Sequence, residues 1–347
     1  DVVGSVLAAT GLGAVVLGTL QSSTWGWVAP KDSPVEPFGF SATLFVIAGG
    51  GALLWGFVRW QRRREGHGQD PLVHLDLLKI PPLRSGLIGM LSQNLILMGI
   101  FFSIPLYLQI VLGLDALETG IKMLPVSIAM FITSAVGSRL SARFTVRSIV
   151  QAGLWTTLLA AVALLATIQP TLADGAFKAS MALLGVGMGL IVSQLGNVVQ
   201  SSVDASGRGE AGGLQYTGQQ LGSSLGVALI GSIVLIGMGG DFVSNIPDDP
   251  ETDAATEAQV EAAVEEGIDF IPADQVQSAL QEAGIDDATS AVIVDDYEDA
   301  SLKALKVGLL AAALLALVSL AFTGDLPHDP PSSGAEEDEP DREVAVA

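Results

Sequence analysis

The chain has 347 residues, of which 50% are hydrophobic and only 15% are charged, and its mean hydropathy is +0.53. This composition excludes a water-soluble globular protein and predicts an all-α, polytopic membrane protein. The net charge of −21 is concentrated in two segments, because 18 of the 37 acidic residues lie in 239–302 and 8 lie in 324–347. The chain has no cysteine, which excludes disulfides, thiolate catalysis and thiolate metal sites.

Eight hydrophobic stretches are long enough to cross a bilayer as helices. In chain order these spans one to eight cover 2–20, 40–58, 86–110, 119–138, 149–168, 176–198, 214–237 and 305–323. Span one follows Asp1 directly, without a charged leader or a cleavage site. We therefore expect the start to be an internal cut in a longer protein and not a signal peptide.

The distribution of basic residues predicts the orientation of these spans. Eleven of the sixteen Lys and Arg residues fall on one side, most of them in 59–84 and 139–147. Because cytoplasmic loops retain Lys and Arg, we place this side in the cytoplasm of a cell-membrane protein. Both ends of the chain are then cytoplasmic, and 239–302 is extracellular.

The polar content of the spans sorts them by environment, because a polar side chain in the bilayer is costly unless it faces protein or water. Spans five and eight are almost entirely apolar, so we expect them to face lipid. Spans three, six and seven carry large amides and should face a protein interior or an aqueous path. These amides are Gln93, Asn94, Gln109, Gln194, Asn197, Gln200, Gln215, Gln219 and Gln220.

Span seven begins "GGLQYTGQQLGSSLG" and has two repeats with an interval of four residues. Gln215, Gln219 and Ser223 form one, and the glycines at 218, 222 and 226 form the other. Side chains four residues apart lie on one helical face. We expect the glycines to let a neighbouring helix approach closely, whereas the glutamines either line a cavity or form hydrogen bonds between helices.

Other polar residues favour structural roles. Glu118 and Lys122 are four residues apart at the outer end of span four, which predicts an interfacial salt bridge; a substrate or proton role for Lys122 is the alternative. The three histidines, His67, His74 and His328, lie in loops, and no nucleophile and base pair can be assembled within the spans. We expect no metal site, no cofactor and no enzymatic activity.

The outer segment 239–302 contains two stretches, beginning at Pro250 and Pro272, in which Pro stands near a helix start and Gly follows its end. They predict a short acidic helical hairpin before span eight, in which Val276, Ala279 and Leu280 share a face; a solvated connecting loop is the alternative. The tail 324–347 is acidic and rich in proline, so we expect it to be disordered.

Three stretches resemble the C-terminal part of a major facilitator superfamily transporter. They are "FSIPLYLQIVLGLDALETGIKMLP" (102–125), "GSRLSARFTVRS" (137–148) and "GVGMGLIVSQLGNVVQSSVDASGRGEAGGLQYTGQQLGSSLGVALIGS" (185–232). More narrowly, the chain resembles the fourteen-span drug:proton antiporters of the EmrB/QacA type. Asp1 to Gly4 also resemble the "DxxG" that opens the linker helix pair of this branch.

This resemblance implies that the eight spans are the last eight of fourteen in a facilitator fold. Residues 1–85 would be the linker helix pair with a basic cytoplasmic loop, and 86–238 the first five helices of the C-terminal half. The acidic hairpin would occupy 239–302, the last helix 303–323 and the cytoplasmic tail 324–347. In such folds the first, second, fourth and fifth helices of a half line the central cavity, which agrees with the sorting by polarity.

The resemblance also implies a proton-coupled antiporter that exports hydrophobic compounds by alternating access. Its partners would be a small hydrophobic substrate, protons and membrane lipids, without nucleic acid, and the protein would be a monomer. The expected substrate-binding residues combine orienting amides with an adaptable apolar lining. They are Gln93, Asn94, Phe102, Tyr107, Met123, Met130, Gln194, Asn197, Gln215, Tyr216 and Gln219.

The loop "GSRLSARFTVR" resembles the family motif close to G-x-L-x-D-R-x-G-R. Ala142 stands at its acidic position and Thr145 at its second glycine, while Arg139, Arg143 and Arg147 remain. These arginines are candidates for a gating loop, or they form a basic loop without a gating role. Two prolines inside spans, Pro105 and Pro125, are candidate hinges.

Spans four and seven lack the acidic residues that some multidrug members carry. Either the proton-carrying carboxylates lie in the absent half, or the substrates are neutral or anionic. Two other functions remain open: a facilitator that exports one specific metabolite, and a membrane interaction or sensor module that does not transport.

Overall fold

The structure is a computed structural model that describes residues 1–31, 33–170, 172–245, 273–282 and 287–327. Within these residues eight helices are long and apolar enough to cross a membrane, which confirms the eight predicted spans. They are α1 (Val2–Trp25), α2 (Ala42–Gly66), α3 (Pro81–Leu106), α4 (Ala116–Leu140), α5 (Val146–Thr167), α6 (Asp174–Ser201), α7 (Arg208–Asn245) and α10 (Asp287–Ala321). Shorter elements are η1 (Pro37–Gly39), η2 (Leu75–Lys79), the π-helical turn η3 (Tyr107–Val111) and α9 (Ala273–Glu282).

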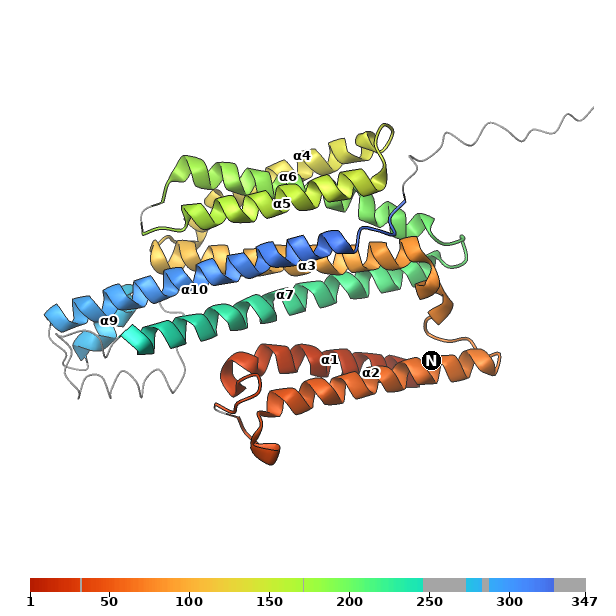
Figure 1. The fold of residues 1–347 in the computed structure, drawn as a ribbon, viewed down its shortest axis with the longest axis horizontal. Helices are drawn as coiled ribbons and strands as arrows, with labels where there is room; N and C mark the ends of the chain where they lie inside the picture. Colours follow the sequence, from red (N-terminus) through yellow and green to blue (C-terminus); the bar gives the residue numbers. More distant parts are fainter. Residues whose placement is uncertain (32, 171, 246–272, 283–286, 328–347) are drawn as a thin grey trace, which may run out of the picture.

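The helices form three layers in Figure 1: α4, α5 and α6 in one, α3, α7 and α10 in the middle, and α1 with α2 in the third. Consecutive spans run in opposite directions, so α3 and α7 are parallel. Their contacts keep a constant register: Gly222 lies beside Leu91 and Gly226 beside Leu95. The chain is therefore a multi-pass helical bundle in which α3 and α7 lie side by side.

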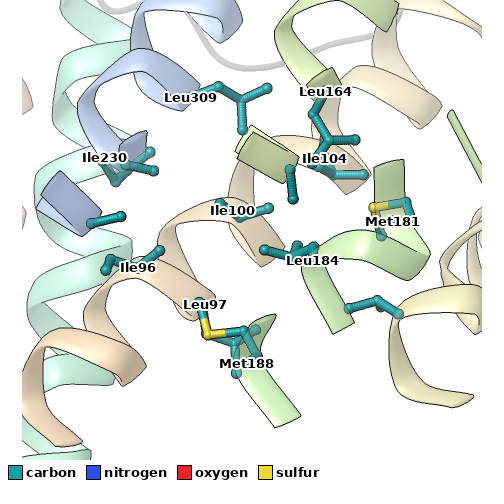
Figure 2. Packing of buried hydrophobic residues seen from close by; sticks show 14 of the residues in the cluster. Ile96, Leu97, Ile100, Ile104, Leu164, Met181, Leu184, Met188, Ile230 and Leu309 are labelled. Carbon is teal, nitrogen blue, oxygen red and sulfur yellow. The ribbon is translucent and has the colours of Figure 1, made fainter. Parts of the chain in front are cut away.

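The hydrophobic core lies where α3 meets α5 and α6 (Figure 2). Ile100 and Ile104 of α3, Leu164 of α5, and Leu184 and Met188 of α6 are all fully buried there. The core continues on the other side of α3 toward α7 and α10. α3 therefore lies between α6 on one side and α7 and α10 on the other.

Glycines bring α6 close to two neighbouring helices. A Cβ atom at Gly185 would overlap a backbone carbonyl of α4, and one at Gly189 would lie 2.7 Å from the Met130 carbonyl oxygen. On another face of α6, a Cβ atom at Gly187 would lie 2.8 Å from the carbonyl oxygen of Gly153 in α5. Such small residues allow close backbone approach in membrane helices, which explains the glycine-rich sequence of this span.

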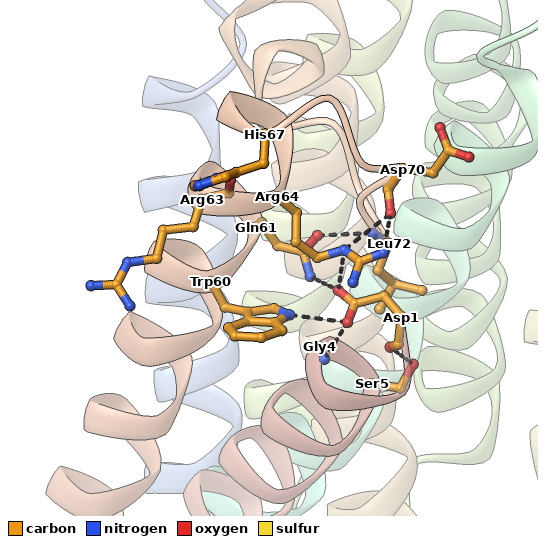
Figure 3. A network of polar contacts seen from close by, with 10 residues as sticks. All are labelled: Asp1, Gly4, Ser5, Trp60, Gln61, Arg63, Arg64, His67, Asp70 and Leu72. Carbon is orange, nitrogen blue, oxygen red and sulfur yellow. Dashed lines mark hydrogen bonds and ion pairs between the residues drawn. The ribbon is translucent and has the colours of Figure 1, made fainter.

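Asp1 joins the two helices of the α1–α2 pair (Figure 3). Its carboxylate accepts hydrogen bonds from the Gly4 backbone N (2.9 Å), Trp60 Nε1 (3.0 Å) and Gln61 Nε2 (2.7 Å), and Arg64 Nε lies 3.8 Å from it. A Cβ atom at Gly4 would overlap both this carboxylate and the Gln61 amide. The "DxxG" pattern is thus a helix N-cap whose glycine leaves room for the capping group.

The last span begins earlier than the sequence analysis predicts. α10 starts at Asp287, so 287–302, expected within the acidic hairpin, is continuous with the membrane helix. Ile293, Tyr297 and Ala300 are buried along one side of this part, whereas Asp295 and Asp299 are exposed. An apolar stripe with helical spacing therefore extends the helix despite the acidic composition.

The rest of the acidic hairpin is only partly described. α9 confirms the predicted helix after Pro272, and Val276 and Leu280 both pack against the core, as expected from their shared face. The first predicted helix of the hairpin, 250–267, and the tail from His328 onward lie outside the described residues.

The exposed apolar surface is not limited to spans five and eight. Trp155 of α5 (56% exposed) and Leu314 of α10 (54%) lie on outward faces, as expected for lipid contact. However, α4 is more exposed than either: Leu117 is 72% exposed and Phe131 78%, and α4 packs mainly against α6. Sorting by polarity therefore does not identify the least covered helix.

Candidate functional site

Five polar residues of α3, α6 and α7 lie along one stripe of α7, where they form two hydrogen-bonded groups. We call this set the amide cluster; its members are Asn94, Gln200, Gln215, Gln219 and Ser223. Gln200 Nε2 donates to Gln215 Oε1 over 3.2 Å, and Ser223 Oγ lies 3.5 Å from Asn94 Oδ1. All five side chains remain partly exposed. The cluster is uncharged, so it offers hydrogen-bond donors and acceptors without a fixed charge.

Close packing of α3 against α7 positions the amide cluster. A Cβ atom at Gly222 or Gly226 would overlap a carbonyl oxygen of α3, and one at Gly218 would lie 3.6 Å from the Leu87 carbonyl oxygen. This confirms the predicted packing role of the glycines. The neighbouring stripe of Gln215, Gln219 and Ser223 is thereby held against α3 and the end of α6.

The hydrogen bonds inside the amide cluster leave capacity for a ligand. Asn94 Nδ2 donates to the Met90 carbonyl oxygen (3.0 Å), and Gln219 Nε2 reaches only the weak acceptor Met90 Sδ at 3.8 Å. Gln93, the residue before Asn94, is 5% exposed. Amides are normally satisfied by protein or water. The partly exposed amides of Asn94 and Gln219 can therefore bind water or a polar group of a substrate.

Gln194 has a different environment from the amide cluster. It is 2% exposed, and its Nε2 donates to the Gly137 carbonyl oxygen of α4 (2.8 Å) and to Ser193 Oγ (3.0 Å). A Cβ atom at Gly137 would overlap the Ser193 side chain. In this conformation Gln194 joins two helices and does not line an open site.

Tyr107 is likewise engaged within the protein. Its side chain is fully buried in η3, and its hydroxyl donates to the Gln169 carbonyl oxygen over 2.7 Å and accepts from the Gln169 backbone N over 3.3 Å. The residue therefore fixes the end of α3 to the turn after α5. In this conformation its hydroxyl is engaged by the backbone, and the substrate contact expected of Tyr107 stays a prediction.

Replacement of Tyr107 by phenylalanine tests this structural role. We expect Tyr107→Phe to lower the free energy of unfolding by about 1 kcal/mol, because the backbone of Gln169 loses a buried partner. Thermal unfolding in detergent measures this change. The relative transport of different substrates should stay the same; a changed substrate preference at unchanged stability would contradict the structural role.

The other predicted binding residues are distributed over the same three helices and α4. Phe102 packs against α7, since its ring would lie 3.3 Å from a Cβ atom at Gly231. Met123 and Met130 of α4 are half-buried against the core. Asn197 and Tyr216 are exposed, Tyr216 by 64%. The substrate-binding role of these five residues stays a prediction.

Gln200 and Ser223 belong to the amide cluster but were not among the predicted binding residues. Gln200 was recognised among the amides of the spans, although the predicted span six ends at 198 and α6 continues to Ser201. Ser223 was recognised in the polar repeat of span seven. The signal that identifies both is a polar side chain three or four residues from a predicted binding amide.

The predicted salt bridge between Glu118 and Lys122 is wrong. Glu118 instead forms a capping box with Asp115: its backbone N donates to Asp115 Oδ1 over 2.7 Å, and its carboxylate lies 3.3 Å from the Asp115 backbone N. Lys122 pairs with Asp174 of α6, which also lies 2.9 Å from Lys178. The lysine therefore joins α4 to α6 at one end of the bundle.

The predicted gating arginines lie around the turn between α4 and α5. Arg139 and Arg143 are exposed, and the Arg147 backbone N donates to the Pro327 carbonyl oxygen over 3.4 Å, beyond the end of α10. Thr145, at the second glycine position of the family motif, caps α5 by accepting from the Ser148 backbone N. Their gating role stays a prediction.

The two predicted hinges have different surroundings. Pro105 precedes the π-helical turn η3, in which the Leu112 backbone N donates to the Tyr107 carbonyl oxygen over 3.2 Å. Pro125 lies inside the continuous helix α4. A π-helical turn accommodates a missing helix hydrogen bond, so the turn after Pro105 is compatible with bending of the helix. The hinge role of both prolines stays a prediction.

A cavity of about 190 Å³ lies apart from the amide cluster. Arg84, Phe322 and Asp325 are among its lining residues, at the start of α3 and the end of α10, and Arg84 Nη2 pairs with Asp325 Oδ2 over 2.7 Å. No residue of the amide cluster is among the lining residues of this cavity. On chemical grounds the amide cluster, and not this cavity, is the candidate site.

Comparison with known proteins gives consistent matches over this region. Residues 2–227 match the Major Facilitator Superfamily. The tetracenomycin C resistance and export protein of Streptomyces glaucescens is 28% identical over 70% of the chain and 42% of its own length. A probable actinorhodin transporter of Streptomyces coelicolor is 29% identical over 74% of the chain and 43% of its own length.

A third relative extends the match to almost the whole chain. The multidrug resistance protein Stp of Mycobacterium tuberculosis is 24% identical over 97% of the chain and 58% of its own length. The chain thus spans about half the length of these relatives.

Proposed function

Because the chain belongs to the Major Facilitator Superfamily, we propose that the complete protein is a proton-coupled antiporter that exports hydrophobic drugs or toxic compounds across the cell membrane. Relatives named for the export of tetracenomycin C and for multidrug resistance support export as the function. On this proposal the substrate is a small hydrophobic molecule, and the mechanism is alternating access.

The amide cluster is the observation that carries this proposal. It provides neutral donors and acceptors on α3, α6 and α7, whose side chains remain partly exposed. Sites for small molecules combine a mostly apolar lining with a few orienting polar groups. Phe102, Met123 and Met130 supply adaptable apolar surface on α3 and α4 in this proposal.

The cavity itself is proposed to lie between this chain and six further helices. Two observations support a second half of the transporter. Apolar residues of α4 are exposed, such as Phe131 (78%), and the chain covers only about half the length of its relatives. We infer that the eight spans are the last eight of a fourteen-span, EmrB/QacA-type transporter, with 1–85 as linker pair and 86–323 as the C-terminal half. The proton-carrying carboxylates would then lie in the other half, or the substrates are neutral or anionic.

The same proposal assigns an orientation and moving parts. Arg139, Arg143 and the other basic loop residues lie on the cytoplasmic side, since cytoplasmic loops retain basic residues, and both ends of the chain are cytoplasmic. The α4–α5 turn serves as the gating loop, and Pro105 and Pro125 serve as hinges when the two halves rock about the site.

Inverted membrane vesicles that contain the complete protein test the proposed function. We expect uptake of a lipophilic dye that requires an inward-acidic proton gradient and stops when a protonophore dissipates it. Vesicles that contain only residues 1–347 serve as the control and should not take up the dye, because half of the cavity wall is missing. Uptake that is independent of the gradient would overturn proton coupling.

A second candidate function is the export of one specific metabolite. Two relatives are named for single compounds, tetracenomycin C and actinorhodin, and this observation favours a narrow substrate range. A panel of chemically unrelated dyes and polycyclic aromatic compounds discriminates the two. Transport of a single scaffold supports the metabolite exporter, whereas transport of several supports the multidrug exporter.

A further inference from the structure

One face of α2 carries a stripe of aromatic and basic residues. Trp55, Arg59, Arg62 and Arg63 are separated by four, three and one residues, so they lie on the same side of the helix. All four are exposed, Trp55 by 66%. The Arg59 guanidinium lies 5.6 Å from the centre of the Trp55 ring, a cation–π distance. We call these four residues the α2 stripe.

The opposite face of α2 is occupied by α1. Leu54 packs against Gly11, Gln61 is fully buried against Asp1, and Arg64 pairs with the Asp1 carboxylate. Figure 3 shows Arg64 pointing toward Asp1 and Arg63 pointing away from it. The α2 stripe therefore lies on the side of the α1–α2 pair that is turned away from α1.

The charges of the arginines in the α2 stripe are not neutralised by acidic side chains of the described residues. Within the described residues, none of Arg59, Arg62 and Arg63 forms an ion pair with an acidic side chain, although Arg64 on the same turn does. Three guanidinium groups within five residues repel one another unless an anion neutralises them. The stripe is therefore suited to bind a negatively charged group from outside the protein.

The position of the stripe along α2 indicates what that group is. Toward the N-terminus the same side of the helix is apolar and exposed, with Leu44 43% and Phe45 38% exposed. The order along the face is thus apolar residues, then tryptophan, then arginines, which matches acyl chains, interface and headgroups of a bilayer. Guanidinium groups bind phosphate through paired hydrogen bonds.

We propose that the α2 stripe binds an anionic phospholipid, with its phosphate on Arg59, Arg62 and Arg63 and its acyl chains along Trp55 and the apolar face. This site is separate from the amide cluster, and its occupant is a lipid and not a transported substrate. The lipid would fix the depth of the α1–α2 pair in the bilayer, since clustered arginines beside a membrane helix attract anionic headgroups.

Native mass spectrometry of the full chain in detergent tests this site. With equal amounts of phosphatidylglycerol and phosphatidylcholine added, the wild-type chain should retain phosphatidylglycerol preferentially. The triple variant R59Q/R62Q/R63Q should lower that preference about tenfold or more. A matched variant, R139Q/R143Q/R208Q, removes the same charge from other exposed positions and should keep the preference.

Three results of this experiment would overturn the proposal. Equal losses in both variants would mean that total charge, not this site, attracts the lipid, and an unchanged triple variant would exclude the stripe. If millimolar inorganic phosphate displaced bound phosphatidylglycerol as effectively as added lipid does, a lipid site would be excluded.

A second measurement does not depend on the triple variant. In vesicles, brominated phosphatidylglycerol should quench tryptophan fluorescence more than brominated phosphatidylcholine, and Trp55→Phe should remove that difference. A difference that persists in this variant would place the lipid elsewhere.

Discussion

Replacement of Gly222 by leucine should prevent α3 and α7 from packing in their native register and should eliminate transport by the complete protein. A Cβ atom at this position would overlap the Leu91 carbonyl oxygen, which belongs to the α3 backbone and cannot rotate away as a side chain would. Overpacking of a tight interface costs about 3 kcal/mol or more where the backbone must move. The midpoint of thermal unfolding in detergent, with dye uptake in vesicles, measures both effects.

Gly213 provides the matched control on the same helix. A Cβ atom there meets no other atom within 4 Å, and the residue is exposed. Gly213→Leu should keep or slightly raise stability, since leucine favours a helix more than glycine does. If Gly222→Leu were as stable and active as Gly213→Leu, the close contact between α3 and α7 would be wrong.

The glycine contacts illustrate what sequence alone can predict. An interval of four residues in span seven identifies a face without side chains, and the structure confirms that a helix packs there. The partner helix could not be predicted, because nothing in 214–237 specifies α3. The contacting residues, such as Leu91 and Gly222, are 131 positions apart in the sequence. Local spacing determines the faces of a helix, whereas the choice of neighbour depends on contacts far apart in the chain.

The amides show where polarity alone fails. Gln194 and Gln219 are both glutamines inside hydrophobic spans, and the sequence assigns them one role. Gln194 is buried and donates to the Gly137 carbonyl oxygen of α4 over 2.8 Å, while among the described residues the Gln219 amide nitrogen reaches the Met90 sulfur alone. Whether a membrane amide joins helices or remains available depends on the residue opposite to it.

The partners of charged residues and the ends of helices also depend on more than local spacing or composition. Lys122 pairs across helices with Asp174 and not with Glu118 on its own helix, because the capping box already engages Glu118. The early start of α10 follows from the apolar stripe at Ile293 and Tyr297, which the acidic composition conceals when residues are counted without regard to helical spacing.

Simultaneous replacement of Gln215 and Gln219 by leucine should impair transport strongly and leave the fold intact. The double variant removes the Gln200–Gln215 hydrogen bond and two of the three α7 side chains of the amide cluster. A hydrogen bond to a substrate contributes about 1 kcal/mol, so the loss of two corresponds to roughly a tenfold or greater decrease in dye uptake. Uptake rates in inverted vesicles, at several dye concentrations, measure this decrease.

Stability separates loss of the site from loss of the fold in this double variant. Hydrogen bonds between membrane helices contribute only about 0.6 kcal/mol each on average, and leucine is favourable in hydrocarbon, so thermal unfolding should change little. Gln220→Leu is the matched control: Gln220 is exposed on the same helix, outside the amide cluster, and its replacement should keep uptake. Uptake by the double variant equal to that of Gln220→Leu would show that the amide cluster does not contact the substrate, and the cavity wall would then have to be sought on the exposed face of α4.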